Sequence, residues 1–94
     1  MKQQQLRVGQ MVKSQQGRDQ GRNFIIIDVL DDQYALLVDG NLRRLDKPKK
    51  KKIKHFKATN QISEEVKNRI ESDGKLNNAL VRKEIEKLTG NEKE

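Results

Sequence analysis

The stretch GRDQGRNFIII, residues 17–27, sets two glycines, each followed by an arginine, directly before one phenylalanine and three isoleucines. The apolar run continues to Leu30 with Asp28 as its one interruption, and its β-branched residues favour a strand. Seven residues, 24–30, are too few for a typical helix but fit a strand that is covered on both faces. The stretch therefore predicts a buried strand that is entered from a positively charged, glycine-containing loop.

Further strands are predicted on both sides of this run. An apolar cluster at Val8, Met11 and Val12 fits a first strand that ends near Ser14, and residues 34–38 fit a third strand. The short segments are separated by turn signals, and one connection is long. This pattern is typical of a small curled sheet or barrel.

The dipeptide Asp39-Gly40 predicts a tight two-residue hairpin, because such a turn needs positive φ. Leu42 with Leu45, and then residues 53–56, are expected to supply the fourth and fifth strands. Pro48 cannot donate to a sheet ladder, so it should lie at an edge or in a loop.

Beyond residue 59 the spacing of apolar residues indicates two helices. Ser63 is the predicted N-cap of the first, which should end at Gly74, and the second should be closed by Gly90. The apolar stripes consist of Ile62, Val66 and Ile70 in the first helix, and of Leu76, Leu80, Val81, Ile85 and Leu88 in the second. Helices this short are not stable alone, so their stripes should pack on each other, on the barrel or on a partner.

Charge divides the chain of 94 residues, whose net charge is +7, into two parts. Residues 1–60 hold 14 Lys and Arg against 6 Asp, which gives +8, whereas residues 61–94 hold 7 against 8, which gives −1. A boundary near residues 57–62 follows. We expect a polar tail at 1–7, a basic domain at 8–57 and a helical extension at 58–94.

Composition excludes several classes of function. The chain has no cysteine, hence no disulfide, thiolate metal site or cysteine nucleophile, and its one histidine, His55, lies among lysines. The loop at residues 17–22 lacks the Lys-Ser or Lys-Thr of a nucleotide-binding P-loop. The acidic pairs Asp31-Asp32 and Glu64-Glu65 fit a turn and a helix start. We therefore expect no enzyme, no cofactor and no metal.

The polar start and the absence of any stretch near the ~20 apolar residues of a membrane span predict a cytoplasmic protein. A surface attachment to anionic membrane has the lysine cluster in its favour. It lacks a basic amphipathic helix with large apolar anchors, so no membrane partner is expected.

Four segments together, residues 8–12, 17–22, 24–30 and 34–40, resemble a KOW motif. The likeness spans about residues 8–56 and is greatest to the KOW-type large-subunit ribosomal proteins of archaea and eukaryotes and to short bacterial KOW-domain RNA-binding proteins. It implies a small five-stranded SH3-like barrel whose glycine-containing loop contacts RNA or a protein. Gly21 corresponds to the motif's central glycine, and Phe24 stands where KOW sequences often have another glycine.

The segment from Arg43 to Lys57 carries nine Lys and Arg against one Asp, a tract that repels itself unless it is solvated or opposed by anions. The aromatic residues number only three, two of them in predicted core strands, so no platform for stacking bases is expected. Phosphate and shape recognition of structured RNA, with ribosomal RNA as the expected class, is therefore predicted. The predicted RNA-binding residues are Ser14, Gln16, Gly17, Arg18, Gln20, Gly21, Arg22, Arg43, Arg44, Lys47, Lys49, Lys50, Lys51, Lys52, Lys54, His55 and Lys57.

The same features allow other interpretations. The glycines could serve only to turn the chain at a barrel corner, and the lysines only to keep the protein soluble. A protein of another class, an adaptor that binds a translation or transcription factor through the barrel or the helices, would carry the same motifs.

Overall fold

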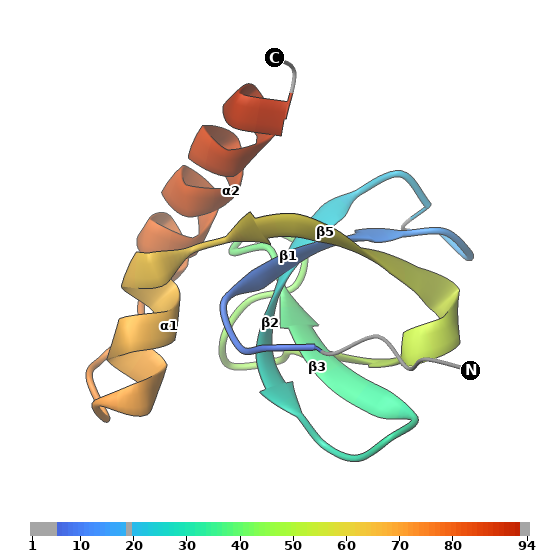
Figure 1. Ribbon diagram of the computed structural model, residues 1–94, viewed down its shortest axis with the longest axis horizontal. Coiled ribbons are helices and arrows are strands. Elements are labelled where there is room, and N and C mark those ends of the chain that lie inside the picture. The colour runs from blue at the N-terminus through green and yellow to red at the C-terminus, as the bar shows by residue number, and fades with distance from the viewer. Residues whose placement is uncertain (1–5, 19, 93–94) are drawn as a thin grey trace.

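The structure, a computed structural model, describes residues 6–18 and 20–92 and consists of a five-stranded antiparallel sheet followed by two helices (Figure 1). The strands are β1 (Gln10–Ser14), β2 (Asn23–Val29), β3 (Tyr34–Val38), β4 (Lys49–Lys52) and β5 (Phe56–Ile62), and their order in the sheet is β4-β3-β2-β1-β5. A 3-10 turn, Ile53–His55, joins β4 to β5, and the helices are α1 (Glu64–Glu71) and α2 (Asn78–Glu92). The expected mainly-β fold with a helical C-terminal segment is confirmed.

The sheet is strongly curled. β4 and β5 occupy opposite edges, yet only the 3-10 turn separates them in the chain. The four residue steps from Lys52 to Phe56 reach at most ~14 Å, whereas the edges of a flat five-stranded sheet lie ~19 Å apart. The sheet must therefore bend to bring its edges together. No strand pair joins β4 to β5 among the described residues, so the sheet is open and the expected closed barrel is not confirmed.

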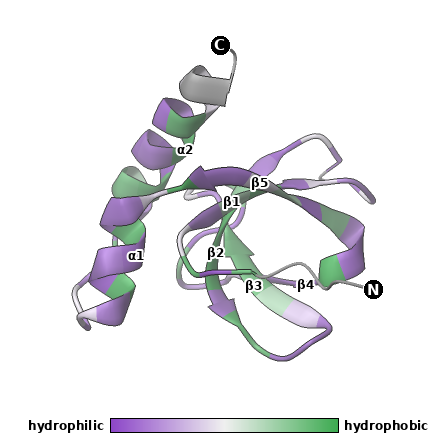
Figure 2. Cartoon of the chain, in the orientation of Figure 1, coloured by the Kyte–Doolittle hydropathy of each residue, from purple (hydrophilic) through white to green (hydrophobic). Residues whose placement is uncertain are grey.

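The apolar run that begins at Phe24 forms most of β2, and both of its faces are covered. Phe24 and Ile26 lie in the core on the concave side of the sheet, whereas Ile25 lies in a second core with Val66 and Val81 of the helices. Figure 2 shows the hydrophobic residues gathered in the central strands and on parts of the helices. Side chains alternate between the faces of a strand, so a strand between two cores needs an unbroken apolar sequence.

The expected hairpin at Asp39-Gly40 is wrong. Residues 39–48 form a wide loop instead, and Leu37 pairs with Lys49 beyond it. The Asp39 carboxylate accepts hydrogen bonds from the backbone N–H groups of Asn41 (2.9 Å) and Arg43 (2.8 Å). This local bonding holds the loop in place of a ladder.

The expected fourth and fifth strands are also wrong. Leu42 is an exposed loop residue, and the fourth strand is the lysine run Lys49–Lys52. Residues 53–55 form the 3-10 turn, and the fifth strand lies further on, where Ala58 pairs with Val12 of β1. Pro48 lies in the loop just before the edge strand β4, as expected.

The first helix begins as predicted, whereas α2 begins at Asn78, so Leu76 lies before it, and both helices end differently. Ser63 caps α1, since its hydroxyl accepts a hydrogen bond from the Val66 N–H (3.1 Å). The left-handed residue after α1 is Asp73, with φ 64°, although the Gly74 N–H also bonds back to the Arg69 carbonyl (2.6 Å). Gly90 does not close α2, which continues to Glu92.

Candidate nucleic-acid interface

The loop between β1 and β2 is a hairpin connection whose two glycines have positive φ, +83° at Gly17 and +87° at Gly21. The Gly21 N–H donates to the Ser14 carbonyl (2.8 Å), and the Ser14 N–H donates to the Arg22 carbonyl (2.9 Å). Only glycine adopts these conformations at little cost, which supports the interpretation that the glycines turn the chain. A Cβ at Gly21 would meet nothing within 4 Å, so the loop also leaves open space above its backbone.

The predicted loop residues fall into two groups. Arg18, Gln20 and Arg22 are exposed, and neither guanidinium group has a hydrogen-bond or ion-pair partner among the described residues. Ser14 is buried, and its hydroxyl donates to the carbonyl of Gln16 (3.1 Å). The arginines are therefore available to a ligand, whereas Ser14 and the Gln16 carbonyl shape the loop itself.

Lys51 connects the lysine strand to this loop. It pairs with Ala35 in the sheet, is only 9% exposed, and donates from Nζ to the Gln16 carbonyl (3.0 Å). A Cβ at Gly17 would lie 3.9 Å from the same Nζ. The glycine loop and β4 are therefore neighbours, but Lys51 serves inside the protein.

The other lysines of β4 are divided between the two faces of the strand. Lys49 stands opposite Leu37, a residue of the concave core, so it shares the inner side with Lys51. Lys50 lies on the outer side, with its Nζ 4.7 Å from the centre of the Tyr34 ring, and Lys52 is paired with Tyr34. The four lysines thus form no single row of cations.

Lys52, at the end of β4, and Lys54, in the 3-10 turn, both line a cavity of ≈ 490 Å³. Residues of the β2–β3 turn and of the segment 53–56 complete the described lining. Its lining residues are Asp32, Gln33, Lys52, Ile53, Lys54 and Phe56.

His55 and Lys57 lie close to the glycine loop, because the His55 carbonyl accepts a hydrogen bond from the Gln15 N–H (2.9 Å). The pKa of His55 is lowered below its usual 6.5, first by burial and then by the charges of Lys54, Lys51 and Lys52. Its imidazole is therefore neutral at pH 7 and offers a hydrogen bond rather than a charge. Lys57 is exposed.

Arg43, Arg44 and Lys47 belong to the wide β3–β4 loop, which lies against the start of α2. The Leu45 N–H donates to Asn78 Oδ1 (2.9 Å), and Arg82 donates to the Gly40 carbonyl (2.6 Å).

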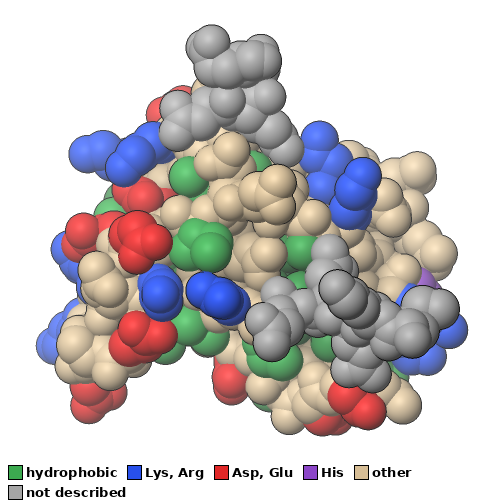
Figure 3. All heavy atoms as spheres, viewed as in Figure 1, with side chains coloured by type: hydrophobic (Ala, Val, Ile, Leu, Met, Phe, Trp, Pro, Cys, Tyr) green, Lys and Arg blue, Asp and Glu red, His purple; other side chains and the backbone are tan. Residues whose placement is uncertain are grey.

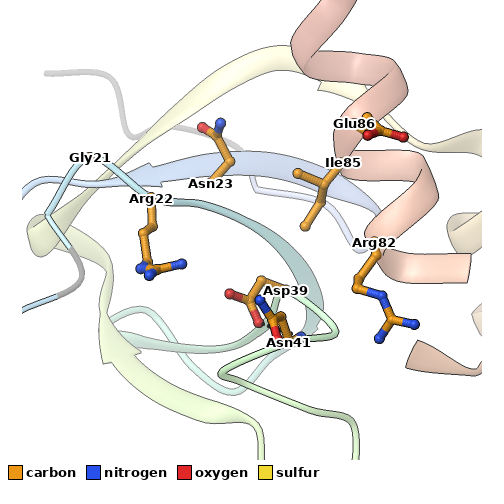
Figure 4. A pocket seen from close by; sticks show the side chains of 8 residues that line it. All are labelled: Gly21, Arg22, Asn23, Asp39, Asn41, Arg82, Ile85 and Glu86. Carbon is orange, nitrogen blue, oxygen red and sulfur yellow. Dashed lines mark hydrogen bonds between the residues drawn. The ribbon is translucent and has the colours of Figure 1, made fainter. Parts of the chain in front are cut away.

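A groove of ≈ 330 Å³ separates this loop from the end of the glycine loop (Figure 4). It is lined by Gly21, Arg22, Asn23, Asp39, Asn41, Arg82, Ile85 and Glu86. The glycine loop thus touches β4 at one end and faces the β3–β4 loop at the other.

Sequence reasoning missed Lys13, which stands directly opposite Lys57 across the β1–β5 pair. Its isolated position between Val12 and Ser14 gave no signal, because only the pairing of the first strand with the last brings the two lysines together. Figure 3 shows acidic side chains intermixed with Lys and Arg over the helices, further acidic side chains at the lower rim, and groups of Lys and Arg at the upper right and beside the histidine.

A comparison of the chain with models of protein families gives no match, and a comparison with curated proteins gives no significant match. Within residues 6–18 and 20–92, neither helix has the length and apolar character to cross a bilayer. The same part of the chain holds no cluster of three or more His, Asp or Glu side chains that could bind a metal ion.

Proposed function

We propose that this chain is a small cytoplasmic RNA-binding protein that contacts structured RNA, with ribosomal RNA as the expected class. The Gly/Arg loop contacts the phosphate backbone with Arg18 and Arg22. Lys52, Lys54, His55 and Lys57 extend this surface on one side, and Arg43, Arg44 and Lys47 extend it on the other.

The observation that carries the proposal is the position of the glycine loop between two basic segments. One end of the loop is bonded to Lys51 of β4, and the other end shares a groove with the β3–β4 loop. Between these ends lie two exposed arginines whose guanidinium groups have no partner in the described part of the protein. Cations of the glycine loop and of the two segments that flank it are thereby held on one fold, which suits a folded polyanion.

The aromatic residues favour backbone recognition over base stacking. Phe24 and Phe56 are buried, and the Lys50 ammonium lies over the ring of Tyr34. The three aromatic side chains of the sequence are thus engaged within the protein. Phosphate contacts from lysine and arginine remain, and these recognise the shape of a duplex rather than a base sequence.

We further propose that the open sheet is an SH3-like barrel of the KOW type. The five antiparallel strands and the glycine loop between the first two support it. The 3-10 turn takes the place of hydrogen bonds between the edges β4 and β5.

An adaptor that binds a protein through its helices remains the alternative. The apolar stripes of the helices are used in packing against the sheet, and the exposed large hydrophobic residues of the described chain lie elsewhere, at Val29, Leu30 and Leu42. RNA binding is therefore the better supported function.

The proposal is tested by reversing the two loop charges with R18E/R22E. We expect affinity for a ribosomal RNA fragment to fall at least tenfold at about 0.1 M salt. The slope of log K against log salt should fall by ~0.7–0.9 for each phosphate that the variant no longer neutralises. The measurement is a titration by fluorescence anisotropy at several salt concentrations.

The matched control is K83E/K87E on α2, where both lysines are exposed. Each double variant lowers the net charge by four, from +7 to +3, so a non-specific effect of charge would be equal in both. Equal losses of affinity in the two variants, or binding by the wild type that does not depend on salt, would contradict the proposal.

A further inference from the structure

Lys13 and Lys57 form a pair of like charges on the face of the sheet that carries the helices. Their neighbours in sequence, Val12 in β1 and Phe56 in β5, lie in the concave core. Because side chains alternate along a strand, both lysines point to the opposite face. They are also in register across the β1–β5 pair, which sets their Cβ atoms ~4.5–5.5 Å apart.

This pair has no counter-charge in the described part of the protein. Both side chains are exposed, and neither ammonium has a hydrogen-bond or ion-pair partner there. Like charges directly opposite in an antiparallel sheet repel each other and weaken the pairing.

The surface around the two lysines is hollowed. They line a cavity of ≈ 410 Å³ together with Ala58, Thr59 and Asn60, and the part of this lining that the structure describes holds no carboxylate. The side chain of Thr59 is fixed by a hydrogen bond to the neighbouring strand, since its hydroxyl donates to the Met11 carbonyl of β1 (2.8 Å). Two neighbouring cations in a hollow whose described lining holds no acid have the chemistry that accepts an anion.

The position of the hollow connects it to the proposed interface. Lys13 is paired on its other side with Asn23, a lining residue of the Arg22 groove. Lys57, Lys13 and Asn23 therefore lie in one row across three neighbouring strands, and the row leads to the glycine loop.

We propose that Lys13 and Lys57 bind one phosphate group, a phosphodiester of the RNA backbone, on the helix-bearing face of the sheet. This inference rests on the proposed RNA-binding function and adds a subsite that neither the glycine loop nor the lysine strand provides. It extends the bound RNA from the loop across β1 to β5.

The test is the double variant K13Q/K57Q, compared with K83Q/K87Q on α2, which removes the same charge. We expect the first variant to bind a ribosomal RNA fragment at least about fivefold more weakly at 0.1 M salt, with a salt slope lower by ~0.7–0.9. Its melting temperature should be unchanged or higher, because a repulsive pair is removed. The control should bind like the wild type.

A second arm separates RNA from free phosphate. Backbone amide signals of Lys13 and Lys57 are followed by NMR during addition of either the RNA fragment or inorganic phosphate. We expect the RNA to shift them at lower concentration. Shifts with phosphate that are equal at equal phosphate concentration would overturn the assignment to an RNA backbone.

The experiment distinguishes refutation of the Lys13–Lys57 subsite from refutation of the RNA-binding function. If the wild type binds RNA and K13Q/K57Q binds equally well, the subsite is refuted while the RNA-binding function stands. If the wild type binds no RNA at low salt, both are refuted together.

Discussion

At the scale of the residue, Ser63 joins the sheet to the helices by two hydrogen bonds of one hydroxyl. The hydroxyl accepts from the Val66 N–H (3.1 Å) as the N-cap of α1 and donates to Glu84 Oε1 of α2 (2.7 Å). Ser63 is 1% exposed and Glu84 is 6% exposed. Burial of a carboxyl group is costly unless the group takes part in hydrogen bonds. The Ser63 hydroxyl therefore has two roles: it caps α1, and it is a hydrogen-bond donor to the buried Glu84 side chain.

Replacement of this serine by S63A is expected to lower the free energy of unfolding by about 1–3 kcal/mol, because it removes the cap and leaves the Glu84 carboxylate without this donor. Urea denaturation measures the change. The control is S72A, at the exposed C-cap of α1, where we expect a change within ~0.5 kcal/mol. Similar small effects of both variants would show that the Ser63–Glu84 hydrogen bond contributes little.

At the scale of the element, β4 shows how a run of four identical residues acquires two roles. Lysine at a sheet edge hinders pairing with another chain, and β4 is such an edge. The alternation of the strand then turns Lys51 inward to the Gln16 carbonyl and Lys50 outward to Tyr34. One lysine fixes the glycine loop, whereas its neighbour remains at the surface.

K51M is expected to free the glycine loop, because methionine keeps most of the apolar stem and lacks the ammonium that bonds to Gln16. Hydrogen exchange should become faster at the Gln20 and Gly21 amides, whose bonds lie within that loop. K50M is the matched control and should leave these amides unchanged. Equal exchange in K51M and the wild type would show that Lys51 does not hold the loop.

At the scale of the whole molecule, the curled sheet lies between two apolar cores. Val12, Phe24 and Leu37 belong to the concave core, and Ile25 with Val81 belongs to the core beneath the helices. The central strand β2 contributes to both. The helices therefore cover a face of the sheet that would otherwise be apolar and exposed, and the molecule should unfold as one unit.

V81A tests this coupling, since Val81 is fully buried on α2. We expect a loss of about 1–3 kcal/mol from the removed methyl groups and the cavity they leave. Fluorescence of the single tyrosine, Tyr34 in β3, and the helical circular dichroism should shift together. Separate midpoints for the two signals would mean that the helices unfold independently. L42A, at an exposed loop residue, is the control and should shift neither signal.

The sequence by itself determined the features that depend on neighbouring residues. The β-branched run predicts β2 with both faces covered, the short apolar segment 34–38 after a turn signal predicts β3, and Ser63 before two glutamates predicts the start of α1. These features follow from local propensity, from the side-chain period and from capping, which act over a few residues. The sequence likewise predicts that Arg18 and Arg22 lie in a glycine-containing loop directly before β2.

Only the tertiary structure decided what depends on contacts between distant segments. A lysine run has low strand propensity, so β4 forms because Leu37 and its neighbours offer a ladder, and Asp39 turns a predicted hairpin into a wide loop. Gly90 lies within α2, which continues to Glu92, rather than at its end. Lys13 lies opposite Lys57 only because β1 pairs with β5, and Lys51 reaches the Gln16 carbonyl only because the sheet is curled. No local sequence pattern encodes either contact.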